Sequence, residues 1–335
     1  IVVGTQRGVD LRYNSQEMAQ DLVNFQKLHL EPAMATLTAS VENTVIQACA
    51  ELTYNTVGLA GSAITTLTYP GLARARLNQY LAPKSNRFLM IDSVTMSELV
   101  NSFRDLTNPA QAIGEQYREG FIARSAMADI YENEKVYIQA NVSTSQATLS
   151  TYTIVNEDNT LTVSNVVAPN PTVGMVFTIG NASTVATALF ACHPETKEVY
   201  THLQQFVLTS STASTFTFSP TIYITGARKN VAAQNGDDII ASSYVSTAIR
   251  FVGAPSSTYP QPMMYHRDAY TFATAALPLM DDAIRCVVKT YDGISLRVWE
   301  GSDIRNDEKL TRIDILFGQA AIRPQWGCRM IGTGT

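Results

Sequence analysis

The residues best suited to holding a metal ion come together once in the sequence, at Cys192, His193 and His202. A thiolate and two imidazoles are donors that zinc accepts. A Cys-His pair followed by a second His nine residues later matches no standard zinc spacing, however, and no fourth donor completes the set. We therefore interpret these three as ordinary loop residues and expect no metal site.

Two other runs carry groups that general acid–base catalysis uses. Asp281 and Asp282 are neighbours in sequence, so their side chains point in different directions, and we interpret them as a solvated turn. In the run YHRD at 265–268, a contact or capping role explains His266 better than that of a general base. No phosphate-binding glycine loop, nucleophile elbow or HExxH motif occurs. The sequence therefore predicts no catalytic, metal-binding or cofactor-binding residue, and no cofactor.

Five arginines suited to phosphate binding each lie near a Glu or Asp, and we expect them to form exposed ion pairs where subunits meet. They are Arg118, Arg124, Arg297, Arg305 and Arg312. Asn141 and Asn181 each begin an Asn-X-Ser triplet, which accepts a glycan only in a secreted protein. We do not expect glycosylation of this chain.

The composition narrows the function classes further. The 335 residues include 24 Lys and Arg against 29 Asp and Glu, a net charge of −5, so sequence-specific nucleic-acid binding is not favoured. Charged residues make up only 16% of the chain, against roughly 25% in an ordinary soluble domain. Neutral polar residues take their place, and these cost less to bury than ions. This composition indicates extensive contact between subunits.

Three features bear on the cellular setting. No apolar stretch is long enough to cross a membrane. The cysteines, Cys49, Cys192, Cys286 and Cys328, are scattered, so we expect reduced thiols in a cytosolic setting. Because the sequence begins at Ile1 and not at Met, we expect a native segment ahead of it.

The first part of the chain reads as a mixture of helices and strands. An extended segment at 1–9, turning at Gly4 and Gly8, precedes a helix at 15–27. A long helix begins at Pro32, and its apolar residues recur every three or four positions. These residues are Met34, Leu37, Val41, Val45, Ala48 and Leu52. The elements expected next are a helix at 69–82 carrying Leu72, Leu77 and Leu81, a strand at 87–91, helices at 96–103 and after Pro109, and a strand at 130–138.

The composition changes abruptly at residue 143. Residues 143–193 include only two charged side chains, Glu157 and Asp158, and consist of short alternating runs typical of strands. Such runs lie at 152–155, 173–179 and 216–218, and the apolar bulk for a core comes from Phe177, Leu189, Phe190, Phe206, Phe216 and Phe218. We predict an inserted all-β domain at 143–243, closed as a barrel or sandwich. The alternative is a low-complexity linker.

Segments 1–142 and 244–335 are then expected to form one α+β host. Its later strands are predicted at 283–290, 295–300, 312–317 and 321–330, returning to pack on the long helix.

Several runs resemble one protein family. They are EPAM at 31–34, ARARL at 73–77, APK at 82–84, RFLMI at 87–91, YREGFIAR at 117–124, MYHRDAY at 264–270 and GQAAIRPQW at 318–326. In this order and spacing they resemble the major coat protein of short-tailed double-stranded DNA bacteriophages, in the branch with an insertion domain. The resemblance covers 15–140 and 245–332, and the middle matches only in place, size and β character.

The resemblance implies the tailed-phage capsid fold named after phage Hong Kong 97. In that fold a peripheral domain holds the long spine helix and antiparallel strands, and an axial domain gathers around symmetry axes. The family's N-terminal arm and most of its extended loop would precede Ile1. The implied partners are copies of the chain itself in pentamers and hexamers, an internal scaffolding protein, a portal, and packaged DNA that is enclosed without sequence-specific binding. No membrane partner is implied.

Our leading hypothesis is a structural subunit of an icosahedral shell, found in the virion and assembled in the host cytoplasm without disulfides. The second hypothesis is a carbohydrate-binding surface module that uses the Thr-rich β insertion, which exposed aromatic residues on that insertion would favour. An enzyme is the third, and it would require a deep pocket with converging carboxylates or histidines.

Overall fold

The structure is a computed structural model that describes residues 1–14, 16, 29–103, 128–142, 146–149, 152–164, 166, 169–180, 188–233, 243–244 and 248–332. Apart from residue 16, the helices expected at 15–27 and after Pro109 lie outside these residues. The chain divides into two compact units, each held together by contacts among its own residues. Unit 1 comprises Ile1–Cys49 and Tyr270–Ala320, and unit 2 comprises Ala50–Ala269 and Ala321–Thr335.

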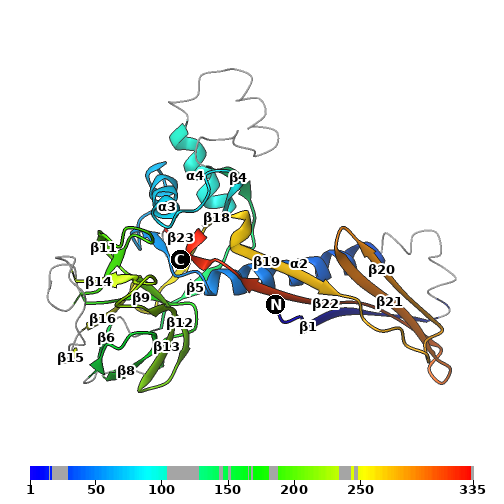
Figure 1. Cartoon of the computed structure of the whole chain (residues 1–335). Coiled ribbons are helices and arrows are strands. Elements are labelled where there is room, and N and C mark those ends of the chain that lie inside the picture. The colour runs from blue at the N-terminus through cyan, green and yellow to red at the C-terminus, as the bar shows by residue number, and fades with distance from the viewer. Residues whose placement is uncertain are drawn as a thin grey trace. The chain divides into compact units, whose positions relative to one another are not determined.

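Unit 1 is a long helix on an antiparallel sheet (Figure 1). The helix α2 spans Glu31–Glu51, so it begins one residue before Pro32, in agreement with a predicted start at Pro32 or one residue earlier. The sheet has the order β1-β22-β21-β20, and β19 pairs with β22 outside this path. Its strands are β1 (Thr5–Asn14), β19 (Tyr270–Ala275), β20 (Arg285–Tyr291), β21 (Ile294–Asp303) and β22 (Glu308–Ala321).

Side-chain alternation along β22 explains why α2 lies on this sheet. Ile313, Ile315 and Phe317 share one face, as residues two apart in a strand must, and all three are buried. They form a core cluster with Leu37 of α2, which is 3% exposed. Val41 and Val45 pack against the same cluster but are only half-buried. The predicted apolar stripe is therefore confirmed up to this point, whereas Leu52 lies beyond the helix and is exposed.

Gly8 does not make the turn that the sequence suggested. It lies inside β1, opposite Asp314 of β22, and the strand continues to Asn14. A Cβ at residue 8 would lie 3.0 Å from the Asp314 Cβ and 3.2 Å from the Ile313 carbonyl oxygen. The glycine therefore allows the two strands to approach closely where Asp314 is buried.

Unit 2 is built on a mixed sheet of order β2-β23-β18-β3-β4. Its strands are β2 (Thr56–Gly58), β3 (Arg87–Ile91), β4 (Asp129–Glu132), β18 (Met263–His266) and β23 (Gly327–Ile331). β2 pairs with β23 and β3 pairs with β4 in parallel, and β18 runs antiparallel to both of its neighbours. Helix α3 (Thr68–Gln79) connects β2 to β3, and α4 (Ser93–Phe103) follows β3.

Three details of this region differ from the prediction. The buried face of α3 consists of Pro70, Ala73 and Leu77, whereas Leu72 and Leu81 are exposed. The single strand expected at 130–138 is instead β4 and a separate short strand β5 (Ile138–Ala140), which pairs with β17 (Thr258–Pro260). The expected strand at 321–330 begins only at Gly327, after a 3₁₀ turn at Pro324–Trp326.

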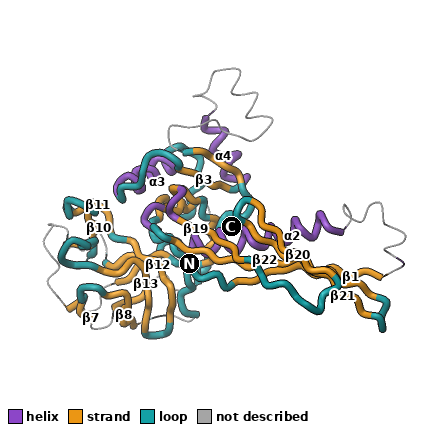
Figure 2. The backbone as a smooth tube through the Cα atoms, turned by 45° about the vertical axis from the view of Figure 1, so that its right-hand side comes forward, coloured by secondary structure: helices purple, strands orange, loops and turns teal. Residues whose placement is uncertain are grey.

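A closed barrel of order β12-β13-β8-β6-β16-β9 occupies the Thr-rich part of unit 2. Figure 2 shows this region as strands joined by loops. Its strands are β6 (Gln146–Leu149), β8 (Asp158–Ser164), β9 (Val176–Ile179), β12 (Gln205–Ser211), β13 (Thr215–Ile222) and β16 (Ala248–Phe251). Phe177, Phe206 and Phe216 are fully buried in its core. A packed core of this kind is not that of a flexible linker.

Smaller elements flank the barrel. A short sheet has the order β11-β10-β14, formed by β10 (Phe190–Cys192), β11 (Val199–Leu203) and β14 (Val231–Ala232). β7 (Tyr152–Thr153) pairs with β15 (Ser243–Tyr244). The barrel strand β16 follows residue 243, so the barrel continues past the end of the predicted 143–243 segment. That the barrel region is a domain of its own stays a prediction.

We expect Val41→Asp to destabilise unit 1. The substitution places a carboxylate without a partner against the cluster around Leu37, which costs about 1–3 kcal/mol of unfolding free energy. Asn43→Asp is the matched control, because it introduces the same group on the exposed side of α2. Urea unfolding of the two variants measures the difference, and equal midpoints would contradict the packing described for Val41.

Candidate functional site

The polar centre of unit 1 is a buried ion pair on the sheet face that points away from the Ile313 cluster. Arg297 of β21 stands opposite Asp314 of β22 in the strand register. The Arg297 Nε donates to Asp314 Oδ1 at 3.0 Å, and Nη2 donates to Oδ2 at 2.6 Å. The two side chains are 3% and 0% exposed. This two-pronged geometry is the strongest form of an Arg–carboxylate contact.

Further contacts join this pair to neighbouring segments. Gln6 of β1 donates through Nε2 to Asp314 Oδ2 at 2.7 Å, and the Arg312 Nε lies 3.4 Å from the same oxygen. Arg297 Nη1 donates to the Pro278 carbonyl at 2.8 Å. The hydrogen bond to Asp314 raises the pKa of Arg297 above its ordinary value. One carboxylate thus links β1, β21 and β22.

The prediction of exposed arginine pairs is wrong for Arg297, which is buried inside its own subunit. Arg312 is half-exposed and lies 3.3 Å from Asp10, as a surface pair would. Arg305 is exposed, and its backbone N–H donates to Asp303 Oδ1 at 2.9 Å. Arg118 and Arg124 lie outside the described residues.

Cys192, His193 and His202 have separate structural roles. Cys192 is buried in β10. The Nδ1 of His193 accepts the backbone N–H groups of Glu195 and Thr196, each at 3.1 Å, and so caps a turn. Within the described part of the chain, no three His, Cys, Asp or Glu residues are grouped so that they could hold a metal ion.

His202 is held neutral by its surroundings. Its ring stacks on Tyr200 with 5.2 Å between the ring centres. Burial, and then the charge of Arg76, lower the pKa of His202 to about 3. An imidazole with this pKa stays unprotonated near neutral pH, so its contribution here is packing.

The acid–base candidates are also structural in the described residues. His266 is buried, accepts the Asp268 N–H through Nδ1 at 3.2 Å and meets Trp326 edge to face at 5.2 Å. This confirms the predicted capping role. Asp281 and Asp282 lie exposed in a turn, as the sequence suggested.

The glycosylation triplets offer no accessible site that the structure describes. The Asn141 side chain is buried, and its Nδ2 donates to the carbonyls of Val252 and Ala254 at 3.0 and 3.2 Å. Asn181 lies outside the described residues.

The cysteines are free thiols, and three of them are buried. Burial raises the pKa of Cys49 and of Cys328 to about 12, which disfavours the reactive thiolate. Cys286 is the half-buried one.

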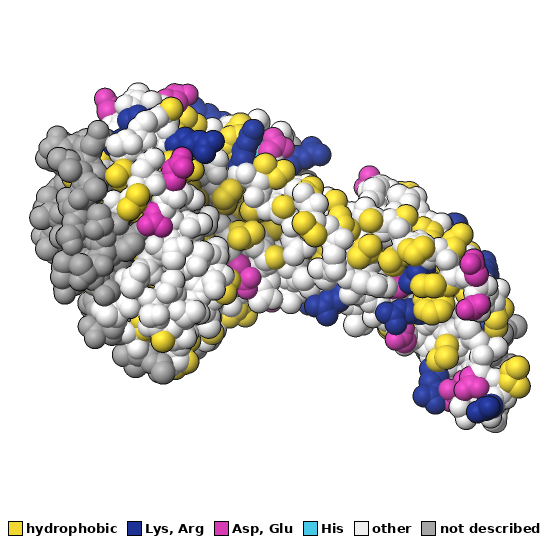
Figure 3. Space-filling view, turned by 60° about the horizontal axis from the view of Figure 1, so that its bottom comes forward, with side chains coloured by type: hydrophobic (Ala, Val, Ile, Leu, Met, Phe, Trp, Pro, Cys, Tyr) yellow, Lys and Arg dark blue, Asp and Glu magenta, His cyan; other side chains and the backbone are white. Residues whose placement is uncertain are grey.

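The barrel's large aromatic side chains point inward. Phe177 is packed with ring-centre distances of 5.7 Å to Phe206 and 5.9 Å to Phe218 and Phe251. They fill the core and do not form the exposed aromatic face on which the carbohydrate hypothesis depended. The face of the molecule in Figure 3 carries large areas of neutral polar side chains and backbone, in keeping with the low share of charged residues (Figure 3).

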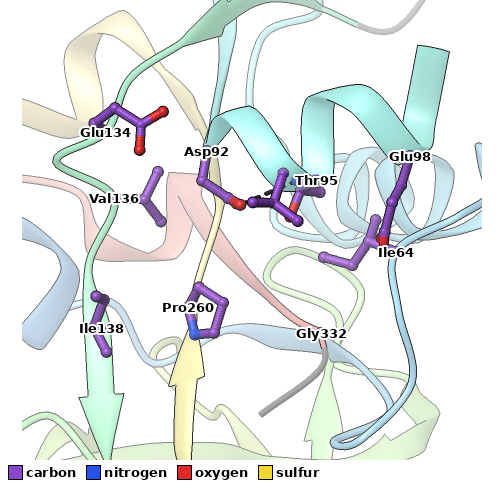
Figure 4. A pocket seen from close by; sticks show the side chains of 10 residues that line it. Ile64, Asp92, Thr95, Glu98, Glu134, Val136, Ile138, Pro260 and Gly332 are labelled. Atoms are coloured by element: carbon purple, nitrogen blue, oxygen red, sulfur yellow. Dashed lines mark hydrogen bonds between the residues drawn. The ribbon is translucent and has the colours of Figure 1, made fainter. Parts of the chain in front are cut away.

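A pocket of about 250 Å³ lies at one edge of the unit 2 sheet, and the sequence analysis missed it. Asp92 and Glu98 line it on the α4 side, and Glu134 and Val136 line the opposite wall (Figure 4). Asp92 caps α4 by accepting the Thr95 N–H at 3.0 Å through Oδ2. An acidic residue directly after the predicted strand 87–91 was the available signal for this edge.

These features define a class of protein. The long helix on antiparallel strands in unit 1, and the mixed sheet with its helices in unit 2, confirm the predicted α+β fold class. The chain belongs to the P22 coat protein family, because the family model described as P22 coat protein, gene protein 5, matches residues 2–332. The protein is therefore a structural coat protein of a tailed phage.

Solved phage structures are similar to this chain at low sequence identity. A structure of Mycobacterium phage Che8 shares 9% identity with a TM-score of 0.46, over 98% of this chain and 71% of that chain. The acidic stable capsid structure of Helicobacter pylori bacteriophage KHP30 shares 9% identity with a TM-score of 0.46, over 98% of this chain and 75% of that chain. Comparison with curated protein sequences gives no match. No helix in the described ranges has the length and apolar character to span a membrane.

We expect Asp314→Asn to destabilise unit 1 by about 3–5 kcal/mol, because it leaves the Arg297 cation buried without its counterion. Asp10→Asn is the matched control, since Asp10 is an exposed partner of Arg312 and such pairs contribute about 0–1 kcal/mol. Chemical unfolding of both variants tests the difference. If the two lose the same stability, the buried pair does not have the importance assigned to it here.

Proposed function

We propose that the protein assembles with copies of itself into the pentamers and hexamers of an icosahedral shell. The observation that carries this proposal is the family match, which covers almost the whole chain at 2–332. The low share of charged residues supports it, because a neutral polar surface loses little on being buried against another subunit.

The further partners follow from membership of the coat family. We propose an internal scaffolding protein that guides assembly, a portal at one vertex, and assembly in the host cytoplasm. The net charge of −5 supports enclosure of DNA without sequence-specific binding, since a net negative chain does not neutralise phosphates. We also propose that the subunit is not an enzyme, and that it acts through geometry and buried contact area.

Electron microscopy of the full chain, expressed with and without the scaffolding protein of its phage, tests the proposed assembly. We expect closed shells, tubes or capsomer rings. The Val41→Asp variant is the control, because a destabilised unit 1 is expected to lower the yield of assembled particles. Dispersed monomers at high concentration under both conditions would contradict the proposal.

We further propose that the barrel region folds as a module within the coat subunit. The closed barrel and its own aromatic core support this. Contacts with the rest of unit 2 exist as well, since Gln205 exchanges hydrogen bonds of 2.8 and 2.9 Å with the backbone of Thr56. The strand β16 pairs with both β6 and β9, so a self-sufficient module has to include it.

We expect a fragment of residues 143–254 to show a cooperative thermal transition and dispersed amide NMR signals. The shorter fragment 143–243 is the matched control, and it should lose both properties because the barrel cannot close without β16. A random-coil spectrum for the longer fragment would show that the barrel depends on the host sheet.

A further inference from the structure

The two edges of the unit 2 sheet carry opposite charges. Because β18 is antiparallel to β23 and to β3, the strands β2, β23, β3 and β4 all point the same way. Their carboxyl ends therefore form one edge of the sheet and their amino ends form the other. In open sheets with parallel strands, the edge at the carboxyl ends is the usual place for binding.

The pocket of Figure 4 lies at the carboxyl edge, and we call it the acidic pocket. Asp92 directly follows β3, Glu134 follows β4 by two residues, and Glu98 lies on α4. No Lys, Arg or His of the described chain forms a salt bridge with any of these three carboxylates. The Asp92 Oδ1 is buried and accepts no hydrogen bond from a described residue.

Apolar side chains surround these carboxylates. Val94 and Ile138 are 68% and 60% exposed at the rim, and Ile64 and Val136 are buried in the wall. An apolar pocket with carboxylates at its rim fits a basic side chain with an apolar stem, or a basic residue beside an aliphatic one.

The amino edge carries the complementary surface, which we call the basic edge. It consists of Leu81, Lys84, Arg267, Ile322 and Arg323. Lys84 precedes β3, Arg267 follows the antiparallel β18, and Arg323 precedes β23. Ile322 is 61% exposed and Leu81 is 40% exposed.

Backbone hydrogen bonds hold the basic edge together. The Arg267 N–H donates to the Asn86 carbonyl at 3.0 Å, and the N–H groups of Ile322 and Arg323 donate to the Ala269 carbonyl at 2.9 and 3.0 Å. None of the three cations forms a salt bridge with a described carboxylate. Asp129 and Asp268 are the acids nearest this edge, and Asp268 lies 3.8 Å from His266.

The sequence keeps the two charges apart. Residues 52–91, which include α3 and lead into β3, contain no Asp or Glu and carry Arg74, Arg76, Lys84 and Arg87. The first acid after this stretch is Asp92, at the carboxyl edge. Each edge also holds the other sign, since Lys135 follows Glu134 and Asp268 follows Arg267, and Arg323 lies over the Trp326 ring at 4.3 Å. Because the carboxylates of the acidic pocket and the cations of the basic edge form no salt bridge with a described residue, a contact between the two edges can still gain electrostatic energy.

We propose that the acidic pocket of one copy of this chain binds the basic edge of the next copy. This inference rests on the proposed assembly into rings of subunits. Since the two surfaces lie at opposite edges of one sheet, each copy offers one surface and receives the other. This is a head-to-tail interface, which closes into a ring when the rotation between copies allows it. The exposed aliphatic side chains on both surfaces supply apolar area, and the charges that form no salt bridge with a described residue fix the orientation.

Charge reversal tests the pairing. We expect Lys84→Glu with Arg267→Glu, or Glu98→Lys with Glu134→Lys, to weaken association at least about tenfold. The variant with all four changes restores opposite charges and should recover assembly. Thermal unfolding of each monomer checks that the fold is kept. Assembly of either double variant at the wild-type level, or no recovery in the fourfold variant with a folded monomer, would overturn the pairing.

A disulfide test separates this interface from the shell proposal. In a Cys286→Ser background, Val94→Cys with Ile322→Cys should give ladders of linked subunits on oxidation of assembled particles, whereas each single substitution should not. Shells without ladders would overturn the interface and leave the coat function intact. Absence of any assembly by the Cys286→Ser parent and by the wild-type chain would overturn the proposed function, and the interface with it.

Discussion

A fully buried carboxylate is the constraint on which unit 1 depends. Asp314 has no exposed surface, and an unpaired charge in that position would destabilise the sheet by about 3–5 kcal/mol. The residue types around Asp314 follow from its burial. Arg297 pairs with it, Gln6 of β1 donates a hydrogen bond to it, and Gly8 leaves room for β1 to approach. The opposite face of the same strand is then free to be apolar and to pack on α2. The register of β22 is therefore critical, because a shift by one residue would exchange its charged face with its apolar face.

The buried polar contacts of unit 2 differ from the buried ion pair of unit 1. Its interior contacts are made mostly by neutral groups, such as the Gln205 amide on the Thr56 backbone and the Asn141 amide on two carbonyls. Amide side chains donate and accept in the same place, so they join loops to strands without the desolvation cost of ions. Neutral polar groups therefore take the place of charged ones inside the subunit as well as on its surface, which accounts for the low share of charged residues.

Much of the fold was predictable because local patterns were strong. Pro32 and the three-to-four spacing located α2, and the run 87–91 located β3. The helical stripe failed at Leu52, and the exposed face of α3 was misjudged, because periodicity gives a stripe but not the partner that covers it. The buried role of Arg297 was missed for a related reason: a nearby acid in sequence says nothing about which strand will face it. The acidic pocket depends on five chain segments that meet only in the folded sheet.

The pairing of β6 with β16 affects how the chain between them is closed during folding and how its length can change in evolution. Ala248 stands opposite Thr148, so the first and last barrel strands are neighbours, about 5 Å apart. The chain between β6 and β16 leaves and returns to the remainder of unit 2 at neighbouring positions, as a closed loop does. The entropy of closing that loop is set by the β6–β16 pair and grows only slowly with the residues inside it. The turns between these two strands can therefore change in length with little effect on the sheet that carries them, as long as contacts such as that of Gln205 with Thr56 are kept.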